Sequence, residues 1–523
     1  MKIVGFQSGH DTSYCILEDG KPIIHEELER FSREKEKLED GLRMFFNYYS
    51  GDLSEIKYFT FGNWGGRSGK WAKQCGEEKY TKQMEDLLDK SGGKFYELSH
   101  HMSHAANAFF SSNLDDALIL TMDGGGTEGP GEVTAFTVYT GKGNKIKKRQ
   151  VWGIDEFNIG SVWNKVLREF GLSVGYPHGN QSGTLMAMAC MGSGDQWLDM
   201  IYNSIKNGSG IQFYNTMDEQ TKFDITNALQ RATEQIVEEV IREFLSKYPN
   251  KNICLAGGCA LNSVFVGKIQ EWFPEIENIY IPPVPYDSGL AIGSAQYLWH
   301  QLLDKPRIRW DDNFTPYLGR SYGLQDIEKT LNENEDIVEW KTVEESDVLK
   351  LLDDQKIISV FGGGSESGRR ALGNRSILAD PRSPKMKDMI NEKVKHRQWF
   401  RPFAPSILRD HVTDWFERDA DSPYMTTVIK FKEEVRDKVP AVVHFDGSAR
   451  LQTVTENDNF WYYNFIKQWY KKTGVPILLN TSFNDREPIV ETPSHAMNCY
   501  LGTNIDYLYF YDFKILVSKT FIY

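Results

Sequence analysis

The chain has 523 residues, of which 40% are hydrophobic and 13% aromatic, and its formal net charge at pH 7 is −13. Because one hydrophobic core rarely serves more than roughly 250–300 residues, we expect two domains. The negative charge argues against broad, nonspecific wrapping of a nucleic acid, but it leaves a nucleotide or a flipped base open as a substrate.

The N-terminal segment and the cysteines bear on where the protein works. Residues 1–9 (MKIVGFQSG) have the pattern of a strand that enters a glycine turn and not that of a signal peptide. The six cysteines form no CxxC pair, which favours reduced thiols over a zinc ribbon or a disulfide framework. Since no run of about 18 apolar residues occurs, we expect a cytoplasmic protein without a membrane span.

Three apolar strands in the first half are each followed by a glycine-containing turn. The turns begin at Gly9, Asp123 and Gly257. Backbone N–H groups of such turns bind phosphate, and three of them in this order are typical of the α/β ATPase fold of actin, sugar kinases and chaperone ATPases (ASKHA), which has two subdomains. The candidate nucleotide- and phosphate-binding residues here are Asp123, Gly124, Gly125, Gly257, Gly258 and Asn262.

A histidine pair lies on a helix predicted to start near Ser99. His100 and His104 are four residues apart and share one helix face, the spacing at which two imidazoles bind one cation. Asp287 lies on a turn before a helix of small residues and would complete a site for Fe²⁺ or another divalent metal. A hydrogen-bonded pair of partly buried histidines is the alternative. His101, next to this pair, either contacts a substrate or packs in the core.

Two further elements are predicted between these turns. Residues 224–247 show apolar side chains at three- and four-residue spacing, with Asp224 placed to cap the helix. The basic segment 141–149 (GKGNKIKKR) is predicted to be the solvated tip of a hairpin.

The polar stretch 302–345 has the composition of a linker with exposed elements, and a new strand pattern starts at Ile357. We therefore place a domain boundary near residue 340. The first domain is residues 1–340 and the second is residues 341–523.

Several segments of the second domain resemble the C-terminal half of NodU/TobZ-type O-carbamoyltransferases. They are 366–382 (ESGRRALGNRSILADPR), 395–405 (KHRQWFRPFAP), 446–454 (DGSARLQTV) and 479–484 (LNTSFN). Because HHMSHAANAFF and DGGG in the first domain fit the same family, the resemblance covers nearly the whole chain.

The resemblance implies an actin-like first domain, similar to tRNA threonylcarbamoyltransferases, fused to an α+β YrdC-like second domain. It implies that carbamoyl phosphate is hydrolysed to carbamate, that ATP adenylates the carbamate with loss of pyrophosphate, and that the carbamoyl group then moves to an acceptor hydroxyl at the metal. Mg²⁺ would accompany ATP in the second domain. We name His10, Asp11 and Lys35 as candidate catalytic residues. A homodimer is compatible with this assignment.

Carbamoyl phosphate and ATP carry several negative charges, so a site that joins them needs guanidinium and ammonium groups. Lys395-His396-Arg397 and Ser482-Phe483-Asn484 match the KxR and SxN motifs of YrdC-like nucleotide sites, where polar side chains would hold phosphate and Mg²⁺. Ordinary surface charge is the alternative. The candidate residues are Arg370, Asn374, Arg375, Lys395, Arg397, Arg401, Ser482 and Asn484.

The acceptor stays open at this level. A hydroxymethyl pyrimidine such as 5-hydroxymethylcytosine, in DNA or as a nucleotide, is slightly favoured by the many lysines and by segment 141–149, and Trp64 or Trp71 would then stack on a flipped base. A sugar or natural-product hydroxyl is the second candidate. From other classes, a tRNA threonylcarbamoyltransferase and an inactive ATP-binding scaffold are considered. The chain departs from the family pattern at Glu36, Thr184, Gly364 and Arg369.

Overall fold

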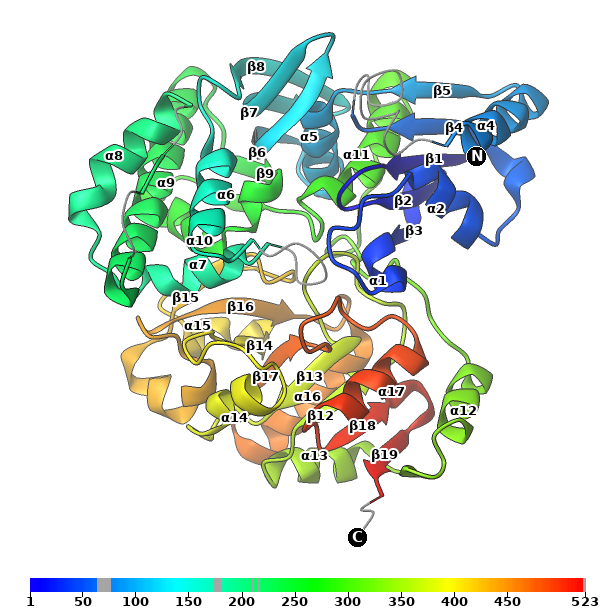
Figure 1. Cartoon of the computed structure of the whole chain (residues 1–523), viewed down its shortest axis with the longest axis vertical. Coiled ribbons are helices and arrows are strands. Elements are labelled where there is room, and N and C mark those ends of the chain that lie inside the picture. Colours follow the sequence, from blue (N-terminus) through cyan, green and yellow to red (C-terminus); the bar gives the residue numbers. More distant parts are fainter. Residues whose placement is uncertain (64–76, 174–179, 209–210, 214–216, 521–523) are drawn as a thin grey trace. The chain divides into compact units, whose positions relative to one another are not determined.

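The computed structural model describes residues 1–63, 77–173, 180–208, 211–213 and 217–520 (Figure 1). The chain divides into two compact units, Met1–Phe314 and Thr315–Tyr523. The division lies before the boundary near residue 340 expected from the sequence. The reason is that β11 (Val338–Thr342) pairs with β19 (Ile515–Lys519) and α12 (Leu324–Asn332) contacts α17 (Pro493–Gly502), so both elements belong to the second unit.

The first sheet of unit 1 has the strand order β3-β2-β1-β4-β5. β1 is antiparallel to β2 and parallel to β4, and β4 is parallel to β5. The strands are β1 Lys2–Gln7, β2 Ser13–Glu18, β3 Lys21–Glu27, β4 Ile56–Phe61 and β5 Lys94–Glu97. The helices of this half are α1 (Leu28–Ser32), α2 (Gly41–Tyr48) and α4 (Glu78–Ser91), with the 3-10 turn η1 (Leu53–Glu55).

The second sheet of unit 1 repeats this arrangement with the order β10-β9-β6-β7-β8. β6 is antiparallel to β7 and parallel to β9, and β9 is parallel to β10. Its elements are β6 Asp116–Gly129, β7 Glu132–Lys142, β8 Lys145–Gly153, α6 Ile159–Glu169, α7 Ser182–Ala189, α8 Asp195–Lys206, α9 Glu219–Lys247, β9 Asn252–Ala256, α10 Ser263–Trp272 and β10 Asn278–Tyr280. This duplicated topology confirms the predicted actin-like fold with two subdomains.

Two helices cross between the sheets and bring their ends together. α5 (His100–Ser111) follows the first sheet but packs on β6 and β9, whereas α11 (Leu290–Tyr297) follows the second sheet but packs on β1, β2 and β4. α5 and α11 also contact each other. The contact of α11 with α5 depends on Gly293, where a Cβ would lie 1.9 Å from the Ser103 carbonyl oxygen. The contact of α11 with β1 depends on Gly5, where a Cβ would lie 1.8 Å from the Ala291 carbonyl oxygen.

The long helix α9 begins five residues before the predicted start. Its N-cap is Asp218, whose carboxylate accepts a hydrogen bond of 2.7 Å from the backbone N–H of Thr221. Asp224 therefore lies inside the helix, and its carboxylate accepts a hydrogen bond from Ser193 N instead. The prediction of a helix to residue 247 is confirmed, but the predicted cap was wrong because several polar residues precede the apolar pattern.

Unit 2 contains a mixed sheet with the order β11-β19-β18-β12-β13-β17-β14-β16-β15. Its other strands are β12 Ile358–Phe361, β13 Arg375–Ala379, β14 Ala404–Leu408, β15 Thr427–Lys430, β16 Ser448–Val454, β17 Ile477–Ser482 and β18 Tyr507–Phe510. Successive residues of a strand, such as Ile377 and Leu378, enter two different hydrophobic clusters on the two faces of the sheet. Its remaining helices are α13 (Glu345–Asp353), α14 (Met386–Lys393), α15 (Val412–Trp415) and α16 (Phe460–Thr473).

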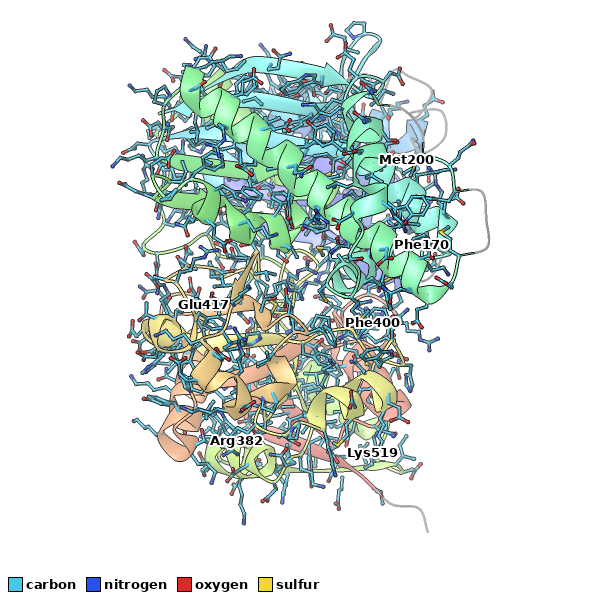
Figure 2. All side chains as sticks on the ribbon, turned by 90° about the vertical axis from the view of Figure 1, so that its left-hand side faces the viewer. Phe170, Met200, Arg382, Phe400, Glu417 and Lys519 are labelled. Carbon is cyan, nitrogen blue, oxygen red and sulfur yellow. The ribbon has the colours of Figure 1, made fainter. Side chains whose placement is uncertain are left out.

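The end of β13 is fixed by Arg382, which Figure 2 labels. Its guanidinium donates to the carboxylates of Asp380 at 2.7 Å and Asp353 at 2.6 Å.

The two units confirm the predicted α/β class, and the sheets of both units are mixed. Within the described residues, no helix combines the length and apolarity needed to cross a bilayer.

Candidate active site

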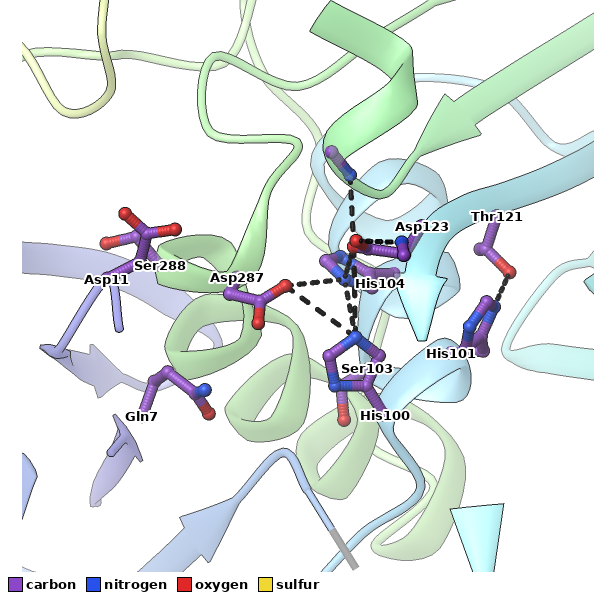
Figure 3. A network of polar contacts seen from close by, with 12 residues as sticks. Gln7, Asp11, His100, His101, Ser103, His104, Thr121, Asp123, Asp287 and Ser288 are labelled. Atoms are coloured by element: carbon purple, nitrogen blue, oxygen red, sulfur yellow. Dashed lines mark hydrogen bonds and ion pairs between the residues drawn. The ribbon is translucent and has the colours of Figure 1, made fainter. Parts of the chain in front are cut away.

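Four side chains of unit 1 converge where α5 and α11 begin (Figure 3). They are His100, His104, Asp123 and Asp287, and one ligand atom of each lies within 4.8 Å of the others. The Nε2 atom of His104 is 3.2 Å from Asp123 Oδ2, 3.4 Å from Asp287 Oδ1 and 3.2 Å from His100 Nε2. Two imidazole nitrogens and two carboxylates thus face one point, as predicted for three of the four residues.

Local structure explains how the four side chains are placed. Ser99 caps α5 and puts both histidines in its first turns. Asp123 ends the apolar run of β6, and its carboxylate accepts hydrogen bonds from Gly124 N at 2.6 Å and Gly258 N at 3.0 Å. Asp287 lies in the 3-10 turn η3 (Asp287–Gly289) that leads into α11.

The electrostatics favour a cation at this point. Burial lowers the pKa of His104, but hydrogen bonds to Asp123 and Asp287 outweigh it and raise that pKa to about 9. Burial alone would raise the pKa of Asp123, but hydrogen bonds from His100 and His104 hold it well below its usual range. The cluster therefore stabilises positive charge between its carboxylates, and its nitrogen and oxygen donors fit a divalent transition metal.

The N-terminus of α5 is anchored by Glu128, which the sequence did not single out. Its carboxylate accepts hydrogen bonds from Ser99 Oγ at 2.5 Å and His101 N at 2.6 Å, and it pairs with Lys148 at 3.0 Å. His101 is fully buried and bonds through its two ring nitrogens to Thr121 Oγ1 and the Thr134 carbonyl oxygen. Of the two interpretations of His101, the structure therefore supports core packing.

Two of the three predicted catalytic residues, His10 and Asp11, lie in the turn after β1. His10 Nδ1 is 3.2 Å from Asp11 Oδ2, and its Nε2 is 3.5 Å from Asp287 Oδ2, which joins this turn to the cluster. The hydrogen bond to Asp11 and the charge of Asp287 raise the pKa of His10 to about 10. His10 is thus a hydrogen-bond donor in this arrangement. Lys35 is half-buried in the turn after α1.

The other predicted phosphate loop residues hold the turns together. Gly257 has φ +87, and a Cβ there would lie 2.1 Å from the Met122 carbonyl oxygen. Gly125 has φ +151. The Asn262 side chain caps α10 by accepting from Val264 N and also donates to Gln230 Oε1 at 2.8 Å. These contacts give Asn262 a structural role, and nucleotide binding by these residues stays a prediction.

Gly126 is required by the ring of His100. A Cβ at Gly126 would lie 2.1 Å from His100 Cγ, whereas a Cβ at Gly124 would meet only Asn164 Nδ2 at 3.6 Å. We therefore expect Gly126→Ala to displace the imidazole and to weaken binding of a divalent metal roughly 10-fold, the scale seen when partners of metal ligands are disturbed. Isothermal titration with Mn²⁺ and Zn²⁺ checks this, with Gly124→Ala as the matched control. Equal affinities in the two variants would contradict the expectation.

In unit 2, Lys395 joins the two predicted nucleotide motifs. Its Nζ donates to Asn484 Oδ1 at 2.6 Å, the Asn484 carbonyl oxygen at 2.7 Å and Ser482 Oγ at 3.3 Å. Ser482 Oγ in turn donates to Asn484 Oδ1 at 2.7 Å. The KxR and SxN segments are thus brought together, although phosphate and Mg²⁺ binding by them stays a prediction.

Guanidinium groups gather near these motifs. Burial and the neighbouring charges of Arg401 and Arg450 lower the pKa of Arg397, and burial and the charges of Arg370 and Arg401 lower that of Arg450. Burial lowers the pKa of Arg401 to about 10. Arginines that repel one another in a desolvated place form a site that an anion would stabilise. We call Arg370, Arg397, Arg401 and Arg450 the arginine cluster.

Two further predicted residues of this domain are tied to neighbouring parts of the chain, and phosphate binding by them stays a prediction. Arg375 is fully buried, and its guanidinium donates to the carbonyl oxygens of Gly362 at 2.6 Å and Arg320 at 3.0 Å. The Asn374 amide donates to the Gly364 carbonyl oxygen and accepts from Tyr511 and Asn459. Both side chains therefore hold the loop that follows β12.

Comparison with known proteins identifies the family. Residues 349–517 match the family described as "Carbamoyltransferase C-terminus", and residues 78–223 and 209–296 match "Carbamoyltransferase N-terminus". The nodulation protein NolO of Bradyrhizobium diazoefficiens is 31% identical over 78% of this chain and 77% of its own length. The chain belongs to the carbamoyltransferase family.

Other relatives extend the likeness. Nodulation protein U of Sinorhizobium fredii is 27% identical over 92% of this chain and 94% of its own length. Among solved structures, HypF of T. kodakarensis is similar at 12% identity, with a TM-score of 0.37, over 58% of this chain and 48% of that one. The family matches and the nodulation-protein relatives show that the protein is a carbamoyltransferase.

Arg450 of this carbamoyltransferase could have been found from the sequence, because it lies inside the matching segment DGSARLQTV.

Of the four departures from the family pattern, Glu36 accepts a hydrogen bond of 3.3 Å from Asn180 N, and the Thr184 hydroxyl donates to Gln181 Oε1 at 3.4 Å. Trp64 and Trp71, named for stacking on a flipped base, lie outside the described residues.

Proposed function

We propose that this protein is an ATP-dependent O-carbamoyltransferase that activates the carbamoyl group in unit 2 and transfers it in unit 1. The observation that carries the proposal is the convergence of His100, His104, Asp123 and Asp287 in unit 1 of a chain of this family. The arginine cluster beside the Lys395 contacts in unit 2 supports the separate activation step.

Activation takes two steps, and each forms one bond to the attacking oxygen and breaks one bond to the leaving group. Water hydrolyses carbamoyl phosphate to carbamate and phosphate, and a carbamate oxygen then attacks the α-phosphorus of ATP and displaces pyrophosphate. Mg²⁺ accompanying ATP would neutralise part of the charge of the leaving pyrophosphate. Arg370, Arg401 and Arg450 would bind the phosphoryl oxygens, since guanidinium groups bind them bidentately. Lys395, held by Ser482 and Asn484, would add a point charge.

Transfer takes place at the unit 1 cluster. A divalent metal bound by the two histidines, Asp123 and Asp287 would act as a Lewis acid toward the phosphate of the leaving AMP. Asp11 accepts the proton of the acceptor hydroxyl as its oxygen attacks the carbamoyl carbon and the bond to AMP breaks. His10 lies between Asp11 and Asp287 and orients the Asp11 carboxylate.

The acceptor that we propose is the hydroxyl of a sugar or another small molecule. The basic segment 141–149 was the reason to consider DNA as the acceptor. It contains the predicted hairpin turn, between β7 and β8, but several of its charged side chains contact other residues of unit 1. Lys148 pairs with Glu128, Lys145 pairs with Asp304, and the Arg149 guanidinium lies over the ring of Tyr248. Two of the lysines are thus partly neutralised by carboxylates of unit 1, which weakens the case for a polyanion as acceptor.

The test combines two measurements on the full chain with Mg²⁺ and Mn²⁺. We expect release of pyrophosphate from ATP only when carbamoyl phosphate is present, and a gain of one carbamoyl unit by mass spectrometry on a sugar from a panel that also contains nucleosides and hydroxymethylated DNA. If the folded protein releases no pyrophosphate with ATP, carbamoyl phosphate and Mg²⁺ present, the proposal is wrong. A gain on the DNA alone would replace the acceptor.

A further inference from the structure

The strand β11 lies at one end of the nine-stranded sheet of unit 2. It pairs with β19 along one side, and no other strand of the described chain pairs with its second side. An edge strand offers unpaired backbone N–H and C=O groups to another chain, and proteins protect such edges with proline, bulges or charged side chains. β11 (VEWKT) has no proline, its register with β19 is unbroken, and its two charges have opposite signs.

The backbone groups on the second side of β11 come from alternate residues. Thr520 N donates to the Ile337 carbonyl oxygen at 3.0 Å, so Ile337 directs its backbone groups toward the neighbouring strand. Because hydrogen-bonded and non-hydrogen-bonded pairs alternate along an antiparallel ladder, every second residue from Ile337 does the same. Trp340 and Thr342 therefore direct their N–H and C=O groups away from β19. The N–H group of Val338 is bonded within the preceding turn, but its carbonyl oxygen faces the same way.

The charges of β11 are complementary to those of a second, antiparallel copy of the strand. With a twofold axis at Trp340, Glu339 of each copy lies opposite Lys341 of the other, in the non-hydrogen-bonded pairs where side chains come closest. An axis at Glu339 would oppose two glutamates, and an axis at Lys341 would oppose two lysines. Because like charges directly opposite each other are destabilising, the axis at Trp340 is favoured over these two neighbouring registers.

The same register covers an apolar side chain that is exposed in the single chain. Trp340 is 39% exposed, although it lies on the same face as Val338 and opposite Val517, and both valines are buried in one hydrophobic cluster. The two indoles related by the axis would be cross-strand neighbours, and aromatic pairs stabilise such positions. The apolar surface of this face would then continue from one copy into the other.

We propose that two copies of this chain associate through β11 and join their nine-stranded sheets into one. The interface is isologous, with hydrogen bonds between the two Trp340 backbones and from Thr342 N–H of each copy to the Val338 carbonyl oxygen of the other. Two short strands bury little surface, so the dimer is weak and forms at high protein concentration. Because the charged pairs are exposed, salt weakens it further. The association does not depend on the proposed reaction.

Charge reversal in β11 tests the proposal by sedimentation velocity on the full chain. Glu339→Lys and Lys341→Glu should each raise the dissociation constant of the dimer roughly 10-fold or more, because each variant places like charges opposite one another. An equimolar mixture of the two variants should form a heterodimer, since every charge of one strand then meets an opposite charge on the other. The double variant Glu339→Lys/Lys341→Glu should dimerise as the wild type does.

The matched control is Lys430→Glu on β15, the exposed position at the opposite end of the same sheet. It changes the net charge as Lys341→Glu does and should leave the dissociation constant unchanged. All three single changes are on exposed side chains, so the Tm should stay at the wild-type value. Wild-type protein that stays monomeric at every concentration overturns the proposal. A dimer that both β11 variants form as readily as the wild type also overturns it, as does a mixture of the two variants that stays monomeric.

Discussion

Changing His104 to Ala is expected to lower carbamoyl transfer at least about 10³-fold while pyrophosphate release changes less than about twofold. His104 lies within 3.4 Å of three other donors of the cluster, so its loss removes the central ligand and leaves two buried carboxylates less compensated. A metal acting as a Lewis acid supplies several kcal/mol of transition-state stabilisation, and each 1.36 kcal/mol is a factor of 10 in rate. The adenylating groups of unit 2 contain no residue of this cluster.

The measurement is the ratio of carbamoylated acceptor to pyrophosphate, with metal content determined on the same sample. His411→Ala is the control, since His411 lies in unit 2 against Tyr470 and Asp414 and has no part in either site. Equal losses of transfer and pyrophosphate release in His104→Ala would show that both reactions use one site, and the division into two steps would fall.

The fold of unit 1 could be predicted because its signals are local. Apolar runs that stop at Gly9, Asp123 and Gly257 identify three strands, which the structure shows as β1, β6 and β9. The end of β6 differs, because this strand continues past Asp123 to Gly129 after a register shift between Met122 and Gly126. The two subdomains followed from the order of the three turns and not from an internal repeat, because the two halves share topology without a visible sequence repeat. The sequence did not indicate the division of the two units after Phe314, because residues 315–340 have the polar composition of a linker. They belong to unit 2 because β11 pairs with β19, which is distant in the sequence.

The candidate site shows the same limit. The spacing of His100 and His104 identifies one helix face, but a spacing cannot show that Asp123 of β6 shares the point with Asp287, 164 positions further along the chain. Arg375 shows the same limit, because it lies in the segment that matches the family, yet its guanidinium donates to backbone carbonyl oxygens of the folded chain. Motif membership predicts where a residue lies, and only its partners show whether it faces a ligand.

Arg450→Gln is expected to lower kcat/KM for carbamoyl phosphate in pyrophosphate release roughly 10- to 100-fold, while the Tm stays equal or rises. The loss follows from a charge-assisted hydrogen bond to a phosphoryl oxygen, about 1.5–3 kcal/mol. The Tm follows from the unliganded protein, in which Arg450 is desolvated beside the charges of Arg370 and Arg401 and its Nε has no partner among the described residues. Removing one of several like charges relieves their repulsion.

A second measurement separates binding from folding. Because a ligand that binds only the folded protein raises its stability by RT ln(1 + [L]/Kd), pyrophosphate should raise the Tm of the wild type more than that of Arg450→Gln. Arg409→Gln is the control, since Arg409 forms an exposed ion pair with Asp419 at 2.7 Å and such pairs contribute little. If Arg450→Gln lowers the Tm without changing kcat/KM, the arginine cluster stabilises the fold and the phosphoryl oxygens must be bound by other groups.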